Sequence, residues 1–156
     1  MQKISPFLWF DDQAEEAMHF YVSVFKNSKV GGITRYGEAG PGPKGSAMTV
    51  WFELEGQHFT ALNGGPYFKF NEAISFVVDC RDQDEVDDLW GKLTADGEPG
   101  QCAWLKDKFG VSWQIVPSIL IESIKDPDPE KSTRVMRAMM QMTKIDIARL
   151  QEAYRG

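Results

Sequence analysis

The sequence predicts an α+β fold in which two βαβββ modules, about residues 1–66 and 71–117, form one domain that is followed by a helical extension over residues 118–156. Three observations predict this fold. Two segments show apolar residues at helical spacing, and each follows a short apolar strand pattern. The two strand-to-helix segments also match one another along the chain. Beyond Pro117 the composition changes to segments that again have helical spacing.

The first module begins with ISPFLWF, which is typical of a strand, and continues with an amphipathic helix over residues 13–26. Asp11 or Asp12 is expected to cap this helix. Three strand-like stretches follow, VGGITRYG, SAMTVWFELEG and QHFTALN. The loop at residues 37–46 is rich in glycine and proline but contains no phosphate-binding motif, so we expect a surface loop there.

The second module repeats this order with AISFVVDC and then RDQDEVDDLWGKL, in which Asp82 is the expected helix cap. The equivalent positions are Ile4 and Ile74, Asp12 and Asp82, Glu15 and Glu85, and Phe20 and Trp90. Aligning Gly56 with Gly110 then pairs Phe59 with Trp113 and Thr60 with Gln114. The second module is either one strand shorter or contains a strand that the pattern does not resolve.

The helical extension starts with DPDPEKSTRVMRAMMQM, where Asp128 is the natural cap and Pro129 the natural first residue. Its apolar face consists of Val135, Met136, Met139, Met140 and Met142. A second helical pattern covers residues 145–154. We expect these helices to pack over the sheet or across a partner subunit.

Composition excludes several classes of function. A net charge of -6 and a pI near 4.9 argue against nucleic acid as a partner, because phosphate binding needs clustered basic residues. The apolar run from Pro6 to Phe10 is far too short to span a membrane. Cys80 and Cys102 form no metal or disulfide motif, which predicts free thiols and a cytoplasmic protein.

The paired modules, the helix ending in FY and the string LWGKLTADGEPGQCAWLKDKFGVSWQIVP resemble the vicinal oxygen chelate superfamily, which includes glyoxalase I, bleomycin-resistance proteins and extradiol dioxygenases. The resemblance is strongest to the PhnB-like family, labelled as a 3-demethylubiquinone-9 3-methyltransferase domain, and extends into the tail DPDPEKSTRVMRAMMQMTKIDIARLQEAY. It implies curved mixed sheets that form an open cup around a ligand, commonly in a homodimer.

The resemblance also shows where metal-dependent relatives hold a divalent ion, namely on the first strand of each module and on a last strand. These positions fall near Ser5 or Pro6, near Ser75 and at Gln114, and none offers an imidazole or a carboxylate. We therefore expect no metal. The segment FDDQAEE after the first strand has no glycine for a methyl donor, so no cofactor is expected either.

The sequence thus favours metal-free binding of a small molecule in the cup. The candidate ligand-binding residues are Phe7, Trp9, Trp51, His58, Thr60, Asn63, Tyr67, Ser75 and Gln114. Two alternatives stay open: an enzyme of the superfamily, whether lyase, isomerase, dioxygenase or the labelled methyltransferase, and a structural protein that assembles through its helical tail. An error of one residue in strand register would bury Gln114 against the helix instead.

Overall fold

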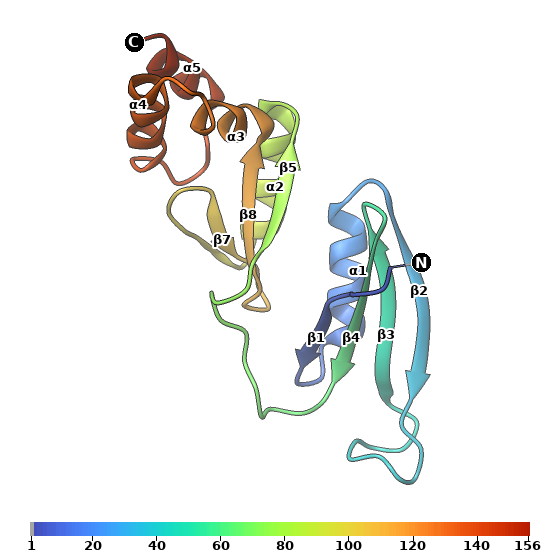
Figure 1. The fold of residues 1–156 in the computed structure, drawn as a ribbon. Helices are drawn as coiled ribbons and strands as arrows, with labels where there is room; N and C mark the ends of the chain where they lie inside the picture. Colours follow the sequence, from blue (N-terminus) through green and yellow to red (C-terminus); the bar gives the residue numbers. More distant parts are fainter. Residues whose placement is uncertain (1) are drawn as a thin grey trace. The chain divides into compact units, whose positions relative to one another are not determined.

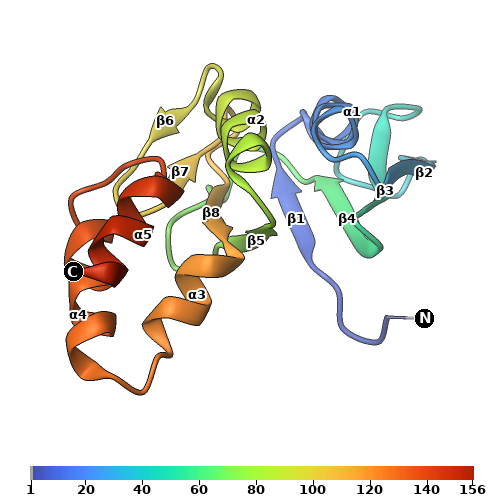
Figure 2. The same ribbon diagram turned by 90° about the horizontal axis from the view of Figure 1, so that it is seen from above.

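The computed structural model describes residues 2–156, and the chain divides into two compact units, the first ending at Phe70 and the second beginning at Asn71. Figure 1 shows that each unit has one sheet and that a helix lies along one face of it. Figure 2 shows the same chain from above, with the C-terminal helices gathered in the second unit. The predicted α+β class, with two βαβββ units and a C-terminal group of helices, is confirmed.

The first unit consists of β1 (Phe7–Phe10), α1 (Ala14–Val24), β2 (Ser28–Arg35), β3 (Ala47–Leu54) and β4 (Gln57–Asn63). Its strand order is β1-β4-β3-β2, and the sheet is mixed because β1 runs parallel to β4 while the other pairs are antiparallel. Alternation along the strands turns Phe52, Phe59 and Ala61 toward the buried core with Met18 and Tyr21 of α1. The opposite face of this sheet carries no helix of the first unit.

The start of α1 differs from the expectation that Asp11 or Asp12 caps it. The N-cap residue is Gln13, which makes no side-chain capping bond. The Oδ1 atom of Asn63, at the end of β4, accepts the hydrogen bond from the Ala14 backbone N–H at 2.8 Å instead. The cap therefore comes from a residue that is far away in sequence, which a local pattern cannot reveal.

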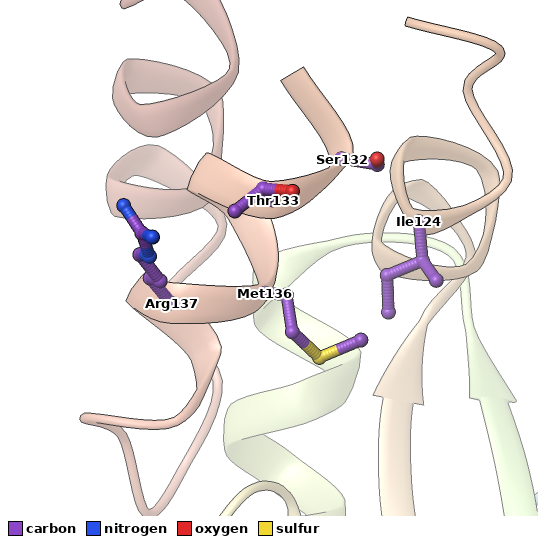
Figure 3. A pocket seen from close by; sticks show the side chains of 5 residues that line it. All are labelled: Ile124, Ser132, Thr133, Met136 and Arg137. Carbon is purple, nitrogen blue, oxygen red and sulfur yellow. The ribbon is translucent and has the colours of Figure 1, made fainter. Parts of the chain in front are cut away.

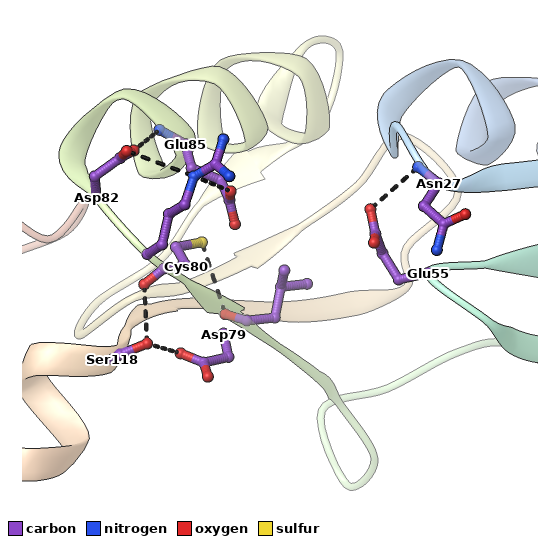
Figure 4. Close-up of polar contacts among 9 residues, drawn as sticks. Asn27, Glu55, Asp79, Cys80, Asp82, Glu85 and Ser118 are labelled. Carbon is purple, nitrogen blue, oxygen red and sulfur yellow. Dashed lines mark hydrogen bonds and ion pairs between the residues drawn. The ribbon is translucent and has the colours of Figure 1, made fainter.

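The second unit contains β5 (Phe76–Cys80), α2 (Gln83–Thr94), β6 (Glu98–Pro99), β7 (Trp104–Lys106) and β8 (Ser112–Pro117), in the order β5-β8-β7-β6. The strand that the sequence did not resolve is β6, which has two residues. Asp82 caps α2 as predicted, because its side chain accepts from the Glu85 backbone N–H at 2.9 Å (Figure 4). Figure 4 also shows Ser118, whose hydroxyl donates to Asp79 where the chain leaves β8.

The strand registers confirm the duplication. Phe7 lies opposite Thr60 in the first sheet, and Val77 lies opposite Gln114 in the second. These pairs are equivalent under the alignment expected from the sequence, which matches Thr60 with Gln114. Both sheets therefore turn the same positions of β4 and β8 away from their helices.

The chain after β8 forms α3 (Ser118–Ile124), α4 (Pro129–Met139) and α5 (Ile147–Arg155). The predicted cap Asp128 and first residue Pro129 of α4 are confirmed, and α3 lies inside the predicted helical extension, although no pattern indicated a separate helix there. These helices pack within the second unit around one apolar cluster, defined as Ala103, Val116, Leu120, Val135, Met142, Ile145 and Leu150. Of the predicted methionine face, Met136 and Met140 remain exposed. No helix within residues 2–156 is long and apolar enough to cross a membrane.

Candidate ligand-binding surfaces

The face of the first sheet opposite α1, called here the first open face, brings four of the candidate residues together. Phe7 on β1, Thr60 on β4 and Trp51 on β3 are direct register partners, so their side chains form one row across three strands. His58 lies two residues before Thr60 and therefore points to the same side. Phe7 is 59% exposed and Trp51 40% exposed, so the row is open to ligands.

Trp51 lies flat because the neighbouring strand β2 has two glycines beneath it. A Cβ atom built on Gly32 would lie 2.7 Å from the indole nitrogen, and one built on Gly31 would lie 2.1 Å from the ring carbon Cε3. The imidazole of His58 stacks beside the indole, with ring centroids 5.6 Å apart and planes 27° from parallel. The sequence GG opposite Trp51 is thus the local reason for the orientation of the ring.

Three other candidates on the first unit are used differently. Trp9 donates its indole N–H to the Gly65 carbonyl at 2.9 Å and packs edge to face with Phe68. Both polar atoms of the Asn63 amide make hydrogen bonds within the fold, since Oδ1 caps α1 and Nδ2 donates to the Ala47 carbonyl at 3.2 Å. Tyr67 is 77% exposed in the loop after β4 and has no hydrogen-bonding partner for its hydroxyl among residues 2–156.

The face of the second sheet opposite α2, called here the second open face, brings the two remaining candidates into contact. The Nε2 atom of Gln114 donates to the Ser75 hydroxyl at 2.9 Å. Ser112 precedes Gln114 on the same side, and its buried hydroxyl finds no partner within residues 2–156. Val77 and Trp104, the register partners of Gln114, complete this face. Strand alternation predicts that Ser112 lies on the side of Gln114, but neither Ser112 nor Val77 nor Trp104 was among the candidate residues.

The sequence reasoning also missed the role of Asp107, in the turn between β7 and β8. This carboxylate is only 3% exposed. Its Oδ1 accepts from the backbone N–H groups of Phe109 and Val111 at 2.9 and 3.1 Å, and its Oδ2 accepts from the Trp113 indole at 2.9 Å. Asp107 thus fixes the turn that leads into Gln114.

The residues of the chain do not fit the divalent ion that the superfamily resemblance implies. Within residues 2–156, no three side chains of His, Cys, Asp or Glu converge to hold an ion. Ser5, Ser75 and Gln114, at the expected ligand positions, are neutral and lack the basicity of imidazole or carboxylate. Burial raises the pKa of the Cys80 thiol to about 12, so it stays protonated and offers no thiolate ligand.

A methyl donor of the nucleoside type does not fit either. Donors of this type are usually held in a doubly wound parallel sheet, at a glycine-rich turn after the first strand. Both sheets here are mixed and four-stranded, and β1 is followed by Asp11, Asp12 and Gln13. No reaction step is therefore assigned to such a donor.

A separate shallow groove of about 210 Å³ lies between α3 and α4 (Figure 3). It is lined by Ile124, Ser132, Thr133, Met136 and Arg137. Its volume is below the roughly 300–1,000 Å³ of typical ligand sites. None of the candidate residues lines this groove.

A duplicated βαβββ fold with partly exposed sheet faces, and with no cluster of metal-ligating side chains within residues 2–156, is that of a class of small α+β proteins that includes binding proteins as well as enzymes. The profile of the family described as 3-demethylubiquinone-9 3-methyltransferase matches residues 2–116. The chain therefore belongs to this family, and its resemblance to PhnB-like proteins is confirmed. The match ends before α3, so the expected resemblance over the tail is not part of it.

Solved structures agree with this assignment. A PhnB protein from Bacillus cereus is 39% identical, covers 75% of this chain and 100% of its own, and superimposes with a TM-score of 0.68. A protein from Pseudomonas aeruginosa is 20% identical, covers 75% of this chain and 98% of its own, and has a TM-score of 0.62, which supports the fold alone. None of the curated proteins matches the chain.

Proposed function

We propose that the protein binds a small organic molecule on its open sheet faces and that it needs no metal to do so. The single observation that supports this most is the hydrogen bond between Gln114 and Ser75. Both lie at positions where the superfamily resemblance implies metal ligands, and here they form a neutral polar pair. The pair recognises a ligand through hydrogen bonds in place of coordination.

The chemistry of the pair defines what it offers to a ligand. One Nε2 hydrogen of Gln114 is used on Ser75, which leaves the second hydrogen and the Oε1 acceptor of the amide. Ser112, on the same side of β8, is buried, and its hydroxyl has no partner within residues 2–156, which costs about 1–3 kcal/mol. A ligand with adjacent donor and acceptor groups would satisfy the remaining atoms of the Gln114 amide.

The test is a screen of a fragment mixture by ligand-observed NMR, run with and without EDTA. We expect binding that EDTA leaves unchanged and that Gln114→Leu weakens, because leucine keeps the volume but removes both polar atoms. Near-stoichiometric bound metal in protein purified without chelator contradicts the proposal. Gln114→Glu is expected to create no metal site, since Ser5 and Ser75 still cannot coordinate.

Methyl transfer, named in the description of the family, is the second candidate function. It is the weaker candidate because β1 is followed by Asp11, Asp12 and Gln13 and not by a glycine-rich turn that could hold a methyl donor. Incubation with S-adenosylmethionine and isolated phenolic acceptors tests it. Saturable transfer that Gln114→Leu abolishes would replace binding by catalysis as the proposed function.

We also propose that the protein forms a homodimer and is located in the cytoplasm. Assembly through the helical tail is the least supported alternative, because the tail buries its apolar cluster within its own unit. Only Met136 and Met140 of its methionines are left exposed for a partner, at 36% and 58%. Sedimentation equilibrium of the wild type and of Met140→Lys measures whether a dimer forms and whether this surface contributes to it.

A further inference from the structure

The Trp51 platform, defined as Trp51 with Phe7, His58 and Thr60, has a shape that limits what can bind to it. One side of the indole is held close to the backbone of β2, because glycines stand at both positions beneath it. The side chain remains 40% exposed, so the outer side of the ring faces away from the sheet. A flat, fixed and accessible aromatic surface is the result.

His58 extends this surface without covering it. Carbon atoms in contact are about 3.5–4.0 Å apart, so a centroid separation of 5.6 Å means that the two rings are offset. The outer part of the indole therefore stays available. Within the platform, Phe7 lies on the opposite side of Thr60 from Trp51, because Phe7, Thr60 and Trp51 share one row of the sheet.

Several polar groups of this face contact one another. Thr60 and His58 make one weak contact, with Oγ1 and Nε2 3.4 Å apart. Lys29 and Glu53, which share a register row with His58, pair with one another at 3.5 Å. The indole N–H of Trp51 has no hydrogen-bonding partner within residues 2–156. The Lys29–Glu53 pair is already matched in charge, and the indole N–H offers a donor to a ring nitrogen or carbonyl.

We infer that the Trp51 platform binds an uncharged planar aromatic or heteroaromatic ring, stacked on Trp51 and oriented by hydrogen bonds to the indole N–H, His58 or Thr60. Aromatic rings prefer such offset stacking, which contributes beyond the burial of their area. The inference rests on the proposed function, since it names the ligand class for one of the open faces.

The test titrates quinoxaline, a flat neutral ring with two acceptor nitrogens, and trans-1,2-cyclohexanediol, a neutral ring without a π-system, into the full chain. Binding is followed through the indole N–H signals in ¹H–¹⁵N spectra. The Trp51 signal is identified as the one that Trp51→Leu removes. We expect quinoxaline to shift this signal and the diol to leave it in place, and Trp51→Leu to weaken quinoxaline binding by about tenfold or more.

Two glycine variants test whether quinoxaline binding depends on the orientation of the Trp51 ring and not only on its presence. Gly32→Ala places a methyl group against the Trp51 indole, where only side-chain atoms are close, so the ring must tilt and quinoxaline binding must weaken. Gly37→Ala is the matched control, because a Cβ there meets nothing within 4 Å and quinoxaline binding should equal that of the wild type. Equal melting temperatures of the two variants show that the fold is intact.

The outcomes distinguish this inference from the proposed function. Fragment binding that depends on Gln114, together with quinoxaline binding that Trp51→Leu leaves unchanged, would show that the inference is wrong and that the proposed function stands. If neither the probes nor any fragment binds, both are wrong. Quinoxaline binding that Gly32→Ala leaves unchanged also overturns the inference, because the fixed orientation of Trp51 is its basis.

Discussion

Asp107 shows how a single buried charge organises the strand that carries Gln114. The carboxylate accepts three hydrogen bonds from its own hairpin, two from backbone N–H groups and one from the Trp113 indole. Burial of a charge is tolerated only when its hydrogen bonds are made, and here both oxygens have donors. The position of Gln114 on the second open face thus depends on a residue that touches no ligand.

Asp107→Ala is expected to destabilise the protein by about 3 kcal/mol or more, because three donors lose a charged acceptor in a buried turn. Asp107→Asn keeps one acceptor oxygen and should therefore cost less than Asp107→Ala, although its NH₂ group then faces at least one donor unfavourably. Urea unfolding followed by tryptophan fluorescence measures both changes.

Asp84→Ala is the matched control, because Asp84 is exposed on α2. Its free energy of unfolding should change by no more than about 0.5 kcal/mol. If Asp107→Ala and Asp84→Ala unfold at the same urea concentration, Asp107 does not organise the hairpin.

Among the elements, those with local signals could be predicted from the sequence and those with distant partners could not. Asp82 and Asp128 cap the helices that directly follow them, as expected. The cap of α1 comes from Asn63 across the sheet, and β6 has only two residues, which is too short for alternation to show. The extra helix α3 directly follows Pro117, where the pattern predicted only the end of a strand.

For the candidate site too, the local features could be predicted from the sequence and the contacts between distant residues could not. Alternation and the repeat placed Thr60 and Gln114 on equivalent faces, and the registers confirm this. The contact between Gln114 and Ser75 joins residues 39 positions apart, so no local pattern reveals it. Whether the candidates bind a ligand stays a prediction, but Asn63 already has a structural task.

Asn63→Ala is expected to lower the free energy of unfolding by about 1–2 kcal/mol, because α1 loses its cap and Ala47 loses a donor. Asn63→Asp should cost less, since a carboxylate still accepts from the Ala14 N–H and is favourable at the start of a helix. Hydrogen exchange at the first turn of α1 checks this. Unchanged protection in Asn63→Ala would show that the cap does not hold the helix.

At the scale of the whole molecule, the region after residue 116 lies outside the family match but is built into the second unit. The backbone N–H groups of Cys102 and Ala103 donate to the Met142 and Thr143 carbonyls, both at 2.9 Å. Gln83 on α2 donates to the Ile145 carbonyl and accepts from the Ile147 N–H. The extension is thus tied by hydrogen bonds to both the loop before β7 and the helix α2.

The ion pair between Lys144 and Asp87 adds a third tie, with a defined dependence on pH. The hydrogen bond from Lys144 and a second one from Gln83 lower the pKa of Asp87. A carboxyl whose pKa is lowered by folding stabilises the folded state above its unfolded pKa, and this contribution is lost as the pH falls below about 4. The pair is exposed, so its contribution is small.

Two substitutions, one on α4 and one just beyond its end, test whether the extension is part of the second unit or a separate arm. Val135 is fully buried in the apolar cluster, whereas Met140 is 58% exposed just beyond the end of the helix. Val135→Asp buries a charge without a partner, so we expect a loss of at least about 3 kcal/mol and exposure of the whole second unit to protease. Met140→Asp should leave stability within about 0.5 kcal/mol. If Val135→Asp releases only residues 118–156 and leaves β5 to β8 protected, the extension is an independent arm, and the second open face does not depend on it.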